Sequence, residues 1–193
     1  MQKIFLVRHR ISIQVLVVLI FAILVICFNF APHEEQAKVE ESMVRFISKA
    51  PLETIIASST NLNGILDTTK RDFLFRINMG SFSGFKSPLQ KEHFEENYLE
   101  IDKYRFASFT GKIIEETSFK NDGLYEVRGK GIFNLHGVSQ EKTIKCLVNV
   151  KNGIYTVSST FNLKLNDYKI LIPYLVQQKI ADEITVSLSI KIK

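Results

Sequence analysis

The sequence contains no tryptophan, so the aromatic part of any apolar interior must come from its 15 phenylalanines and 6 tyrosines. Only two cysteines are present, Cys27 in an apolar N-terminal stretch and Cys146 in a predicted strand. The first would lie in lipid and the second in a protein core, so no intramolecular disulfide is expected. Cys146 alternates with Ile144 and Val148, a pattern that favours a small core residue.

Motifs for catalysis, metal binding and nucleotide binding are also missing. The segment Gly80–Gly84 has Phe82 rather than serine at its centre, so it cannot form a nucleophile elbow. His93 lacks the second histidine of an H-E-x-x-H pair, and only His136 remains outside the N-terminal region. No glycine-rich loop fits a phosphate. We therefore predict a non-enzymatic protein with no metal and no cofactor.

The positive charge of the chain is concentrated at its start. The net charge is +5, but Lys3, Arg8 and Arg10 precede every acidic residue, and the rest of the chain has 22 basic against 20 acidic residues. A nucleic-acid-binding domain would present a clustered basic face. No nucleic-acid partner is expected.

The N-terminal region has the pattern of a membrane-directed segment. Residues 11–30 carry no charge and follow the basic residues, a length and polarity that fit a helix crossing the inner membrane with a cytoplasmic N-terminus. Residues 1–31 would be either a cleaved signal peptide or an uncleaved signal anchor. The anchor is favoured because Asn29 and Pro32 flank a poor cleavage site at Ala31. Residues 32–38 are interpreted as a linker, and the rest of the chain, 39–193, as one domain facing outward from that membrane in the cell envelope.

The domain is predicted to be all-β. From Tyr125 to Leu135, odd positions are apolar or glycine and even positions are mostly polar, as expected for a wall with one dry face and one wet face. Gly129 and Gly131 on the dry face indicate a bend or a close approach. Eight runs have such strand character: 42–48, 57–66, 71–79, 105–116, 124–135, 142–150, 153–165 and 183–192.

Eight mainly antiparallel strands favour closure into a barrel, which removes exposed edges. A barrel of this size is either filled by side chains or holds one small ligand. Periodicity alone leaves both alternatives open.

Two helical interruptions are predicted near the barrel mouth. Residues 88–101 begin with the capping pattern Ser87, Pro88, Gln90 and carry Phe94 and Tyr98 at helical spacing. A second short helix is expected from Tyr174 to Ala181, after Pro173. Either helix could serve as a lid over a cavity or as a plug that completes the core.

The run HFEENYLEIDKYRFASFTGKI, followed by DGLYEVRGKGIFNLHGV, resembles the YceI-like family of bacterial lipid-binding domains, and the resemblance extends more weakly over residues 38–193. It implies a lipocalin-like β-barrel that encloses a long apolar chain, typically a polyisoprenoid, in an extracytoplasmic compartment. Arg105 and Leu89 replace a proline and a methionine that are frequent in the family, which leaves open a lipid other than the usual ligand of the family.

The resemblance and the alternation together predict an apolar lining and a polar rim. The lining residues are Phe73, Phe75, Ile77, Phe94, Tyr98, Phe109, Ile113, Val127, Gly129, Gly131, Phe133, Leu135, Phe161, Leu163, Leu165 and Leu175, and the rim residues are Arg105, Asn134, His136 and Tyr168. The expected partner is a long-chain isoprenoid or another apolar lipid. The alternative is a structural or interaction module of the cell envelope with a filled barrel.

Overall fold

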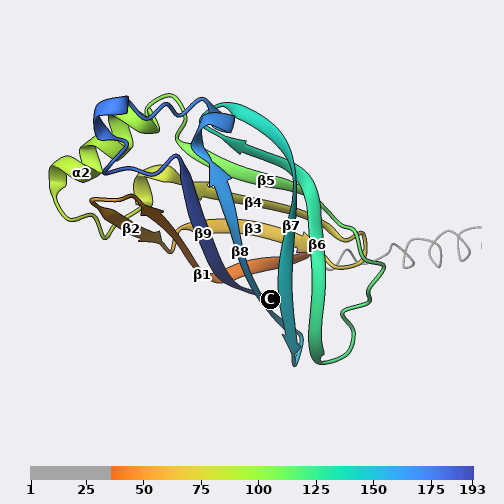
Figure 1. Ribbon diagram of the computed structural model, residues 1–193. Helices are drawn as coiled ribbons and strands as arrows, with labels where there is room; N and C mark the ends of the chain where they lie inside the picture. The colour runs from red at the N-terminus through yellow and green to blue at the C-terminus, as the bar shows by residue number, and fades with distance from the viewer. Residues whose placement is uncertain (1–35) are drawn as a thin grey trace, which may run out of the picture. The chain divides into compact units, whose positions relative to one another are not determined.

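The computed structural model describes residues 36–193, which form one antiparallel sheet that closes on itself (Figure 1). The predicted membrane segment, 11–30, lies outside the described residues. Within 36–193, no helix is long and apolar enough to cross a membrane. The strands are β1 (Gln36–Lys49), β2 (Thr54–Ser59), β3 (Leu62–Asp67), β4 (Asp72–Asn78), β5 (Phe106–Ile113), β6 (Gly123–Leu135), β7 (Val138–Lys151), β8 (Ile154–Lys164) and β9 (Glu183–Ile192).

The nine strands occupy eight positions around the barrel, as the sequence predicts. β1 pairs with β9 along one edge. On its other edge β1 pairs with β3 through residues 36–38 and with β2 through residues 44–49. β2 and β3 therefore form one interrupted strand, and the pairing of β1 with β9 closes the ring.

The interruption between β2 and β3 has a local cause. The backbone N–H of Asn61 donates to Ser59 Oγ at 3.0 Å, a side-chain contact that competes with the sheet ladder. Ser42 on β1 covers the gap, because its Oγ donates to the Thr60 carbonyl at 2.8 Å and accepts from Leu62 N–H at 3.2 Å. The single run predicted over 57–66 is thus two short strands joined through a side chain.

The predicted helix at 88–101 is present as α2 (Pro88–Glu92), which continues into the π-helical stretch η2 (His93–Tyr98). Ser87 Oγ accepts from Gln90 N–H at 3.1 Å, and Gln90 Oε1 accepts from Lys86 N–H at 2.9 Å. Pro88 occupies the first turn. The capping pattern predicts this start correctly, with Lys86 as the backbone donor to the glutamine side chain.

Two boundary predictions are wrong. The residues Tyr174–Ala181 do not form a helix, because only the 3₁₀ turn η4 (Tyr174–Val176) follows Pro173 and no side chain caps it. Two further short 3₁₀ turns are η1 (Met79–Ser81) and η3 (Leu165–Tyr168). At the other end of the domain, Gln36–Lys38 lie in β1 and pair with β3, so they are not part of a linker.

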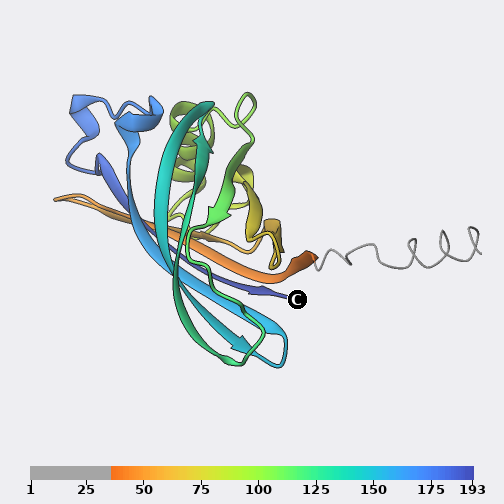
Figure 2. The same ribbon diagram turned by 90° about the vertical axis from the view of Figure 1, so that its right-hand side faces the viewer.

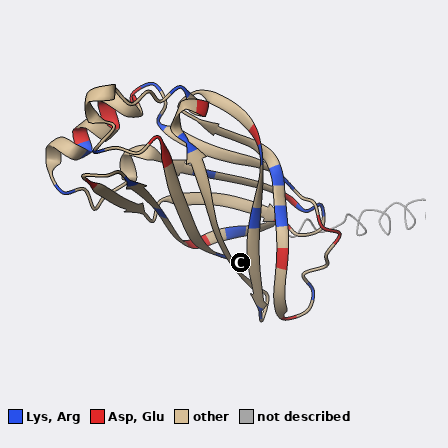
Figure 3. Cartoon of the chain, viewed as in Figure 1, with Lys and Arg blue, Asp and Glu red and all other residues tan. Residues whose placement is uncertain are grey.

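The dry and wet faces of β6 agree with the alternation in the sequence. Val127 is buried at 4% exposure, whereas Glu126, Arg128 and Lys130 lie on the outer surface (Figure 3). All nine strands and two buried apolar clusters belong to residues 36–193. This part of the chain therefore has the closed sheet and the core that it needs to fold by itself.

Candidate functional site

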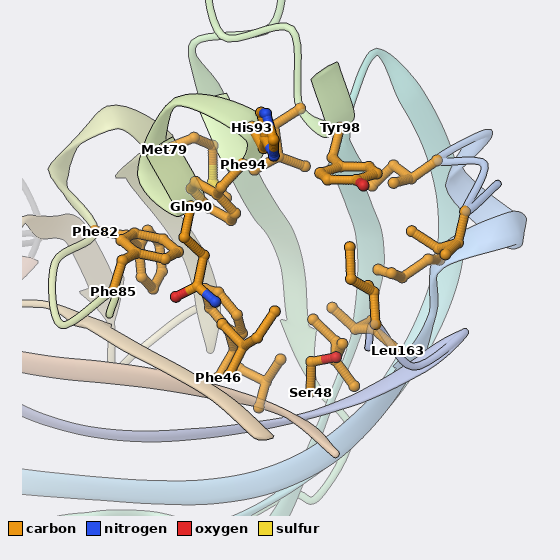
Figure 4. Close-up of a pocket in the computed structure, with 18 of the residues that line it drawn as sticks. Phe46, Ser48, Met79, Phe82, Phe85, Gln90, His93, Phe94, Tyr98 and Leu163 are labelled. Carbon is orange, nitrogen blue, oxygen red and sulfur yellow. The ribbon is translucent and has the colours of Figure 1, made fainter. Parts of the chain in front are cut away.

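The barrel is hollow. A cavity of about 500 Å³ lies at the end of the barrel that carries α2 and η2, a volume within the range of ligand-binding pockets (Figure 4). Its walls come from β1, β2, β4, β5, β6, β8 and β9, and the helical segment covers it. The lining residues that are exposed to solvent are Ser87, Leu89, His93 and Lys179. They mark the mouth, between the helical segment and the connection from β8 to β9.

A second compartment of about 150 Å³ continues the cavity toward the opposite end of the barrel. The two compartments share the side chains of Val44, Ile77, Ala107, Phe133 and Val186. The inner one is lined almost wholly by carbon, with Phe73, Phe109 and Phe161 among its residues. The two compartments are therefore adjacent, with these five side chains between them, and both are lined mainly by apolar groups.

Phenylalanine rings form the cover of the outer compartment. The ring of Phe94 on η2 stacks on Phe46 of β1, with centroids 5.4 Å apart and an angle of 13° between the rings. Phe82 and Phe85 pack against Phe94 with centroids 6.0 and 4.9 Å away. These contacts hold the helical segment over a cavity that it does not fill. It therefore has the geometry of a lid and not of a plug.

Polar groups gather at the mouth. Glu53 accepts hydrogen bonds from Lys86 Nζ at 3.2 Å and from Gln90 Nε2 at 3.0 Å, and these bonds tie the start of α2 to the turn between β1 and β2. Gln90 and Tyr98 reach from the helical segment into the cavity opposite Phe46 and Ser48 (Figure 4). Partial burial raises the pKa of Tyr98, so its hydroxyl remains a neutral donor at physiological pH.

The far end of the helical segment is fastened by His136. Its Nδ1 lies 3.0 Å from the Tyr168 carbonyl oxygen and its Nε2 lies 3.1 Å from Glu100 Oε2, and its ring packs edge-on against Tyr104. Hydrogen bonds from Lys103 and His136 lower the pKa of the Glu100 carboxyl. The histidine thus joins the hairpin between β6 and β7 to the segment after η2 and to η3.

Fourteen of the sixteen predicted lining residues face the two compartments. Those in the outer compartment are Ile77, Phe94, Tyr98, Phe133, Leu135, Leu163 and Leu165. Those in the inner compartment are Phe73, Phe75, Ile77, Phe109, Ile113, Val127, Gly129, Phe133 and Phe161. The other two, Gly131 and Leu175, line neither compartment.

The two exceptions have different physical reasons. Gly131 lies opposite Gly111 of β5, and a Cβ atom at this position would lie 2.1 Å from the Thr110 carbonyl oxygen. The glycine therefore serves the close approach of two strands and makes no room for a ligand. Leu175, which was predicted on a helix facing the barrel, lies in η4 and is 91% exposed.

None of the four predicted rim residues lines the mouth. Arg105 is exposed, Asn134 donates to Ser139 Oγ at 2.9 Å, and His136 fastens the lid. Tyr168 is 0% exposed and is packed in the core. Its hydroxyl has no hydrogen-bond partner among the described residues, and burial raises its pKa to about 12. The predicted rim is therefore wrong, because the mouth lies between α2 and the β8–β9 connection.

The groups that do surround the mouth were missed: Ser48, Glu53, His93 and Lys179, together with Gln90, which the sequence indicated only as a helix cap. A weak signal exists, because Gln90 follows the only S-P step in the chain and begins the lid. Glu53 and Lys179 come from turns far apart in sequence. Within the described residues, no group of three His, Cys, Asp or Glu side chains could hold a metal ion.

Solved structures with the same fold support this architecture. A polyisoprenoid binding domain from Saccharophagus degradans, implicated in plant cell wall breakdown, matches with a TM-score of 0.69 and 16% identity over 83% of this chain and 99% of that one. BcnA from Burkholderia cenocepacia matches with a TM-score of 0.64 and 14% identity over 78% and 95%. The Campylobacter jejuni YCEI protein matches with a TM-score of 0.55 and 15% identity over 70% and 82%.

A search of curated proteins finds no match. The family model of the YceI-like domain, in contrast, matches residues 36–192, which include every strand of the barrel and both compartments of the cavity. The chain therefore belongs to the YceI-like domain family.

Proposed function

We propose that this protein binds a long-chain apolar lipid of the polyisoprenoid type inside its barrel, as a carrier and not as an enzyme. The observation that carries the proposal is the two-compartment cavity, which is apolar from its shared waist to its inner end. A neighbour in fold is described as a polyisoprenoid binding domain. The barrel of the alternative, a filled structural module, would leave no such space.

Burial of the tail would supply the affinity. Each CH₂ group removed from water contributes about 0.8 kcal/mol, so a ten-carbon tail contributes about 8 kcal/mol before the cost of ordering it. Phenylalanine rings from several strands, such as Phe73, Phe109 and Phe161, would supply much of the apolar contact with the tail. The inner compartment has a volume of only about 150 Å³, which favours an unbranched or methyl-branched chain over a bulky apolar ligand.

The polar end of the lipid would remain at the mouth. Gln90 and Tyr98 point into the outer compartment and carry hydrogen-bonding groups, and Ser48 lies across from them (Figure 4). The Glu53 carboxylate beside Gln90 is paired with Lys86 Nζ at 3.2 Å, so the groups that face the cavity here, Gln90, Tyr98 and Ser48, are uncharged. A neutral head with hydroxyl or carbonyl oxygens fits the arrangement best.

The experiment that tests the proposal compares the lipid content of a variant with a blocked cavity and a variant with a changed outer surface. Ala107 lies at the waist between the compartments, so Ala107→Phe would fill the passage to the inner one. Ile132→Phe places the same ring on the outer face of β6, where the native side chain is 48% exposed. Each protein is purified, extracted with organic solvent and examined by mass spectrometry, and is then titrated with isoprenoid alcohols of increasing length.

The native protein and Ile132→Phe should bind long isoprenoid alcohols with equal affinity. Ala107→Phe should keep the short ones and lose at least tenfold in affinity for the long ones, about 1.4 kcal/mol or more. Thermal unfolding of each variant is measured to check that the barrel is intact. If the native protein neither carries lipid nor binds any of these alcohols, the carrier function is wrong. Equal binding by Ala107→Phe would place the ligand outside the barrel.

A further inference from the structure

Four strongly exposed apolar side chains of the described domain lie around the cavity mouth. Leu52 is 68% exposed, Leu89 57%, Tyr174 85% and Leu175 91%. They come from three separate segments: the turn between β1 and β2, the helix α2, and η4 in the β8–β9 connection. Figures 1 and 2 show that the β1–β2 hairpin and the β8–β9 connection project from the same side of the barrel.

The contacts of these segments place them at the mouth. The backbone N–H of Leu52 donates to the Gln178 carbonyl at 2.8 Å, which joins the hairpin turn to the chain that follows η4. Leu89, Val176 and Lys179 line the outer compartment where it reaches solvent. The apolar tips are therefore continuous with the opening through which a lipid would pass.

A lysine accompanies each apolar tip. Lys49 lies three residues before Leu52, Lys86 three residues before Leu89, and Lys179 four residues after Leu175, and all three lysines are exposed. Lys86 also contacts Glu53, and the acidic residues of the lid, Glu92 and Glu96, are exposed nearby. Apolar tips flanked by lysine are suited to the boundary of a bilayer, where the tips enter the acyl region and the ammonium groups remain at the phosphates.

We propose that this end of the barrel docks on the surface of a lipid bilayer, with Leu52, Tyr174 and Leu175 inserted. The inference rests on the proposed lipid binding, since it explains how a water-insoluble ligand would reach the cavity without crossing water. Short, separate tips at different positions fit a fluid, deformable surface better than the continuous groove or flat face that a folded protein partner needs. Tyr174 has the amphipathic ring that is enriched at membrane interfaces.

The test uses residues 36–193, which contain the complete barrel, so that the segment at 11–30 cannot bind the membrane itself. Three leucine or tyrosine tips that do not line the cavity are changed together, as Leu52→Ser, Tyr174→Ser and Leu175→Ser. The matched control is Leu124→Ser, at the start of β6, where the side chain is 65% exposed and lines neither compartment. Binding is measured by co-sedimentation with vesicles of phosphatidylcholine, with and without phosphatidylglycerol.

The native domain and Leu124→Ser should bind the vesicles, more strongly when phosphatidylglycerol is present. The triple variant should bind about tenfold or more weakly. It should nevertheless retain isoprenoid alcohol added in detergent, because its cavity is unchanged. Equal vesicle binding by the triple variant, or no binding by the native domain, would overturn the docking surface. The docking surface would also be overturned if the three substitutions abolished a complex with another protein but left vesicle binding unchanged. If the native domain did not bind the isoprenoid alcohol, the carrier function would be overturned instead.

Discussion

Tyr168 is the residue whose environment is least expected. Its hydroxyl is buried without a hydrogen-bond partner, and an unsatisfied buried polar group costs about 1–3 kcal/mol. Tyr168→Phe removes the hydroxyl and keeps the ring contact with Phe133, whose centroid lies 5.7 Å away. We expect the variant to be more stable by about 1 kcal/mol in urea unfolding at neutral pH. A loss of stability would show that the hydroxyl has a partner, such as a bound water.

The pH dependence of the same variant provides a second measurement. Burial holds the pKa of Tyr168 at about 12, above the value of 10.0 of an exposed tyrosine, so the folded state keeps the proton more tightly than the unfolded state. The contribution of this pKa difference to the free energy of unfolding is complete below pH 10 and is lost as the pH rises toward 12. The stability difference between Tyr168→Phe and the native protein should therefore widen above pH 10, in unfolding curves recorded at matched ionic strength.

Gly131 is the second position where one residue decides the local structure. Gly131→Ala would place a methyl group 2.6 Å from the Cα of Gly111 and closer still to the Thr110 carbonyl, so β5 must move. We expect a loss of about 1–3 kcal/mol or more in urea unfolding. Gly123→Ala on the same strand meets only the Tyr125 ring, at 3.6 Å, and should change stability by less than about 0.5 kcal/mol. Equal effects would mean that the two strands separate easily.

At the scale of the element, β6 is one of the strands that separate the cavity from solvent. Phe133 lines both compartments, so Phe133→Asp would place a carboxylate in an apolar space without a partner. The variant should lose about 3 kcal/mol or fail to fold. Lys130→Asp introduces the same carboxylate on the outer face, where the native side chain makes only an exposed ion pair with Glu141 at 3.2 Å.

The outer-face variant should change the free energy of unfolding by no more than about 1 kcal/mol. Circular dichroism and urea unfolding of both proteins, prepared side by side, give the comparison. If Phe133→Asp were tolerated as well as Lys130→Asp, water would have to enter the cavity freely, and the apolar character on which lipid binding depends would be absent.

The lid is the other element on which function depends. Glu53 and Gln90 hold its start, and His136 holds the segment after its end, while its centre rests on the ring of Phe46. The ends are held by polar contacts near solvent, which are individually weak. The centre is held by aromatic packing over an open space.

At the scale of the whole molecule, the location of the protein remains a prediction from residues 1–31. Because the candidate cleavage site at Ala31 is poor, we expect the full-length chain in the inner-membrane fraction, with the barrel open to protease added from the periplasmic side. The measurement is fractionation with protease protection, followed by N-terminal sequencing. A soluble protein that begins near Pro32 or His33 would show a cleaved signal peptide and would leave the carrier function intact.

Much of the fold could be predicted from the sequence because its signals are local. The alternation along β6 assigns its two faces, and the pattern at Ser87, Pro88 and Gln90 places the start of the lid, since both depend on neighbours only a few residues away. The same local signals overstate the segment after Pro173, where only the 3₁₀ turn η4 forms, although Val176 and Ile180 still line the outer compartment. Leu175 is exposed there, on a turn.

The site depended on contacts between distant residues, which only the tertiary structure decided. Gly111 faces Gly131 through the register of the sheet, whereas Phe46 meets Phe94 and Glu53 reaches Gln90 because the helical segment packs on the barrel. A barrel is hollow when the space that its eight strand positions enclose exceeds the volume of the side chains that point inward. This difference is small compared with either volume. By itself the sequence determined which side chains point inward. The closure of β1 on β9 decided how much room they leave and where the cavity opens.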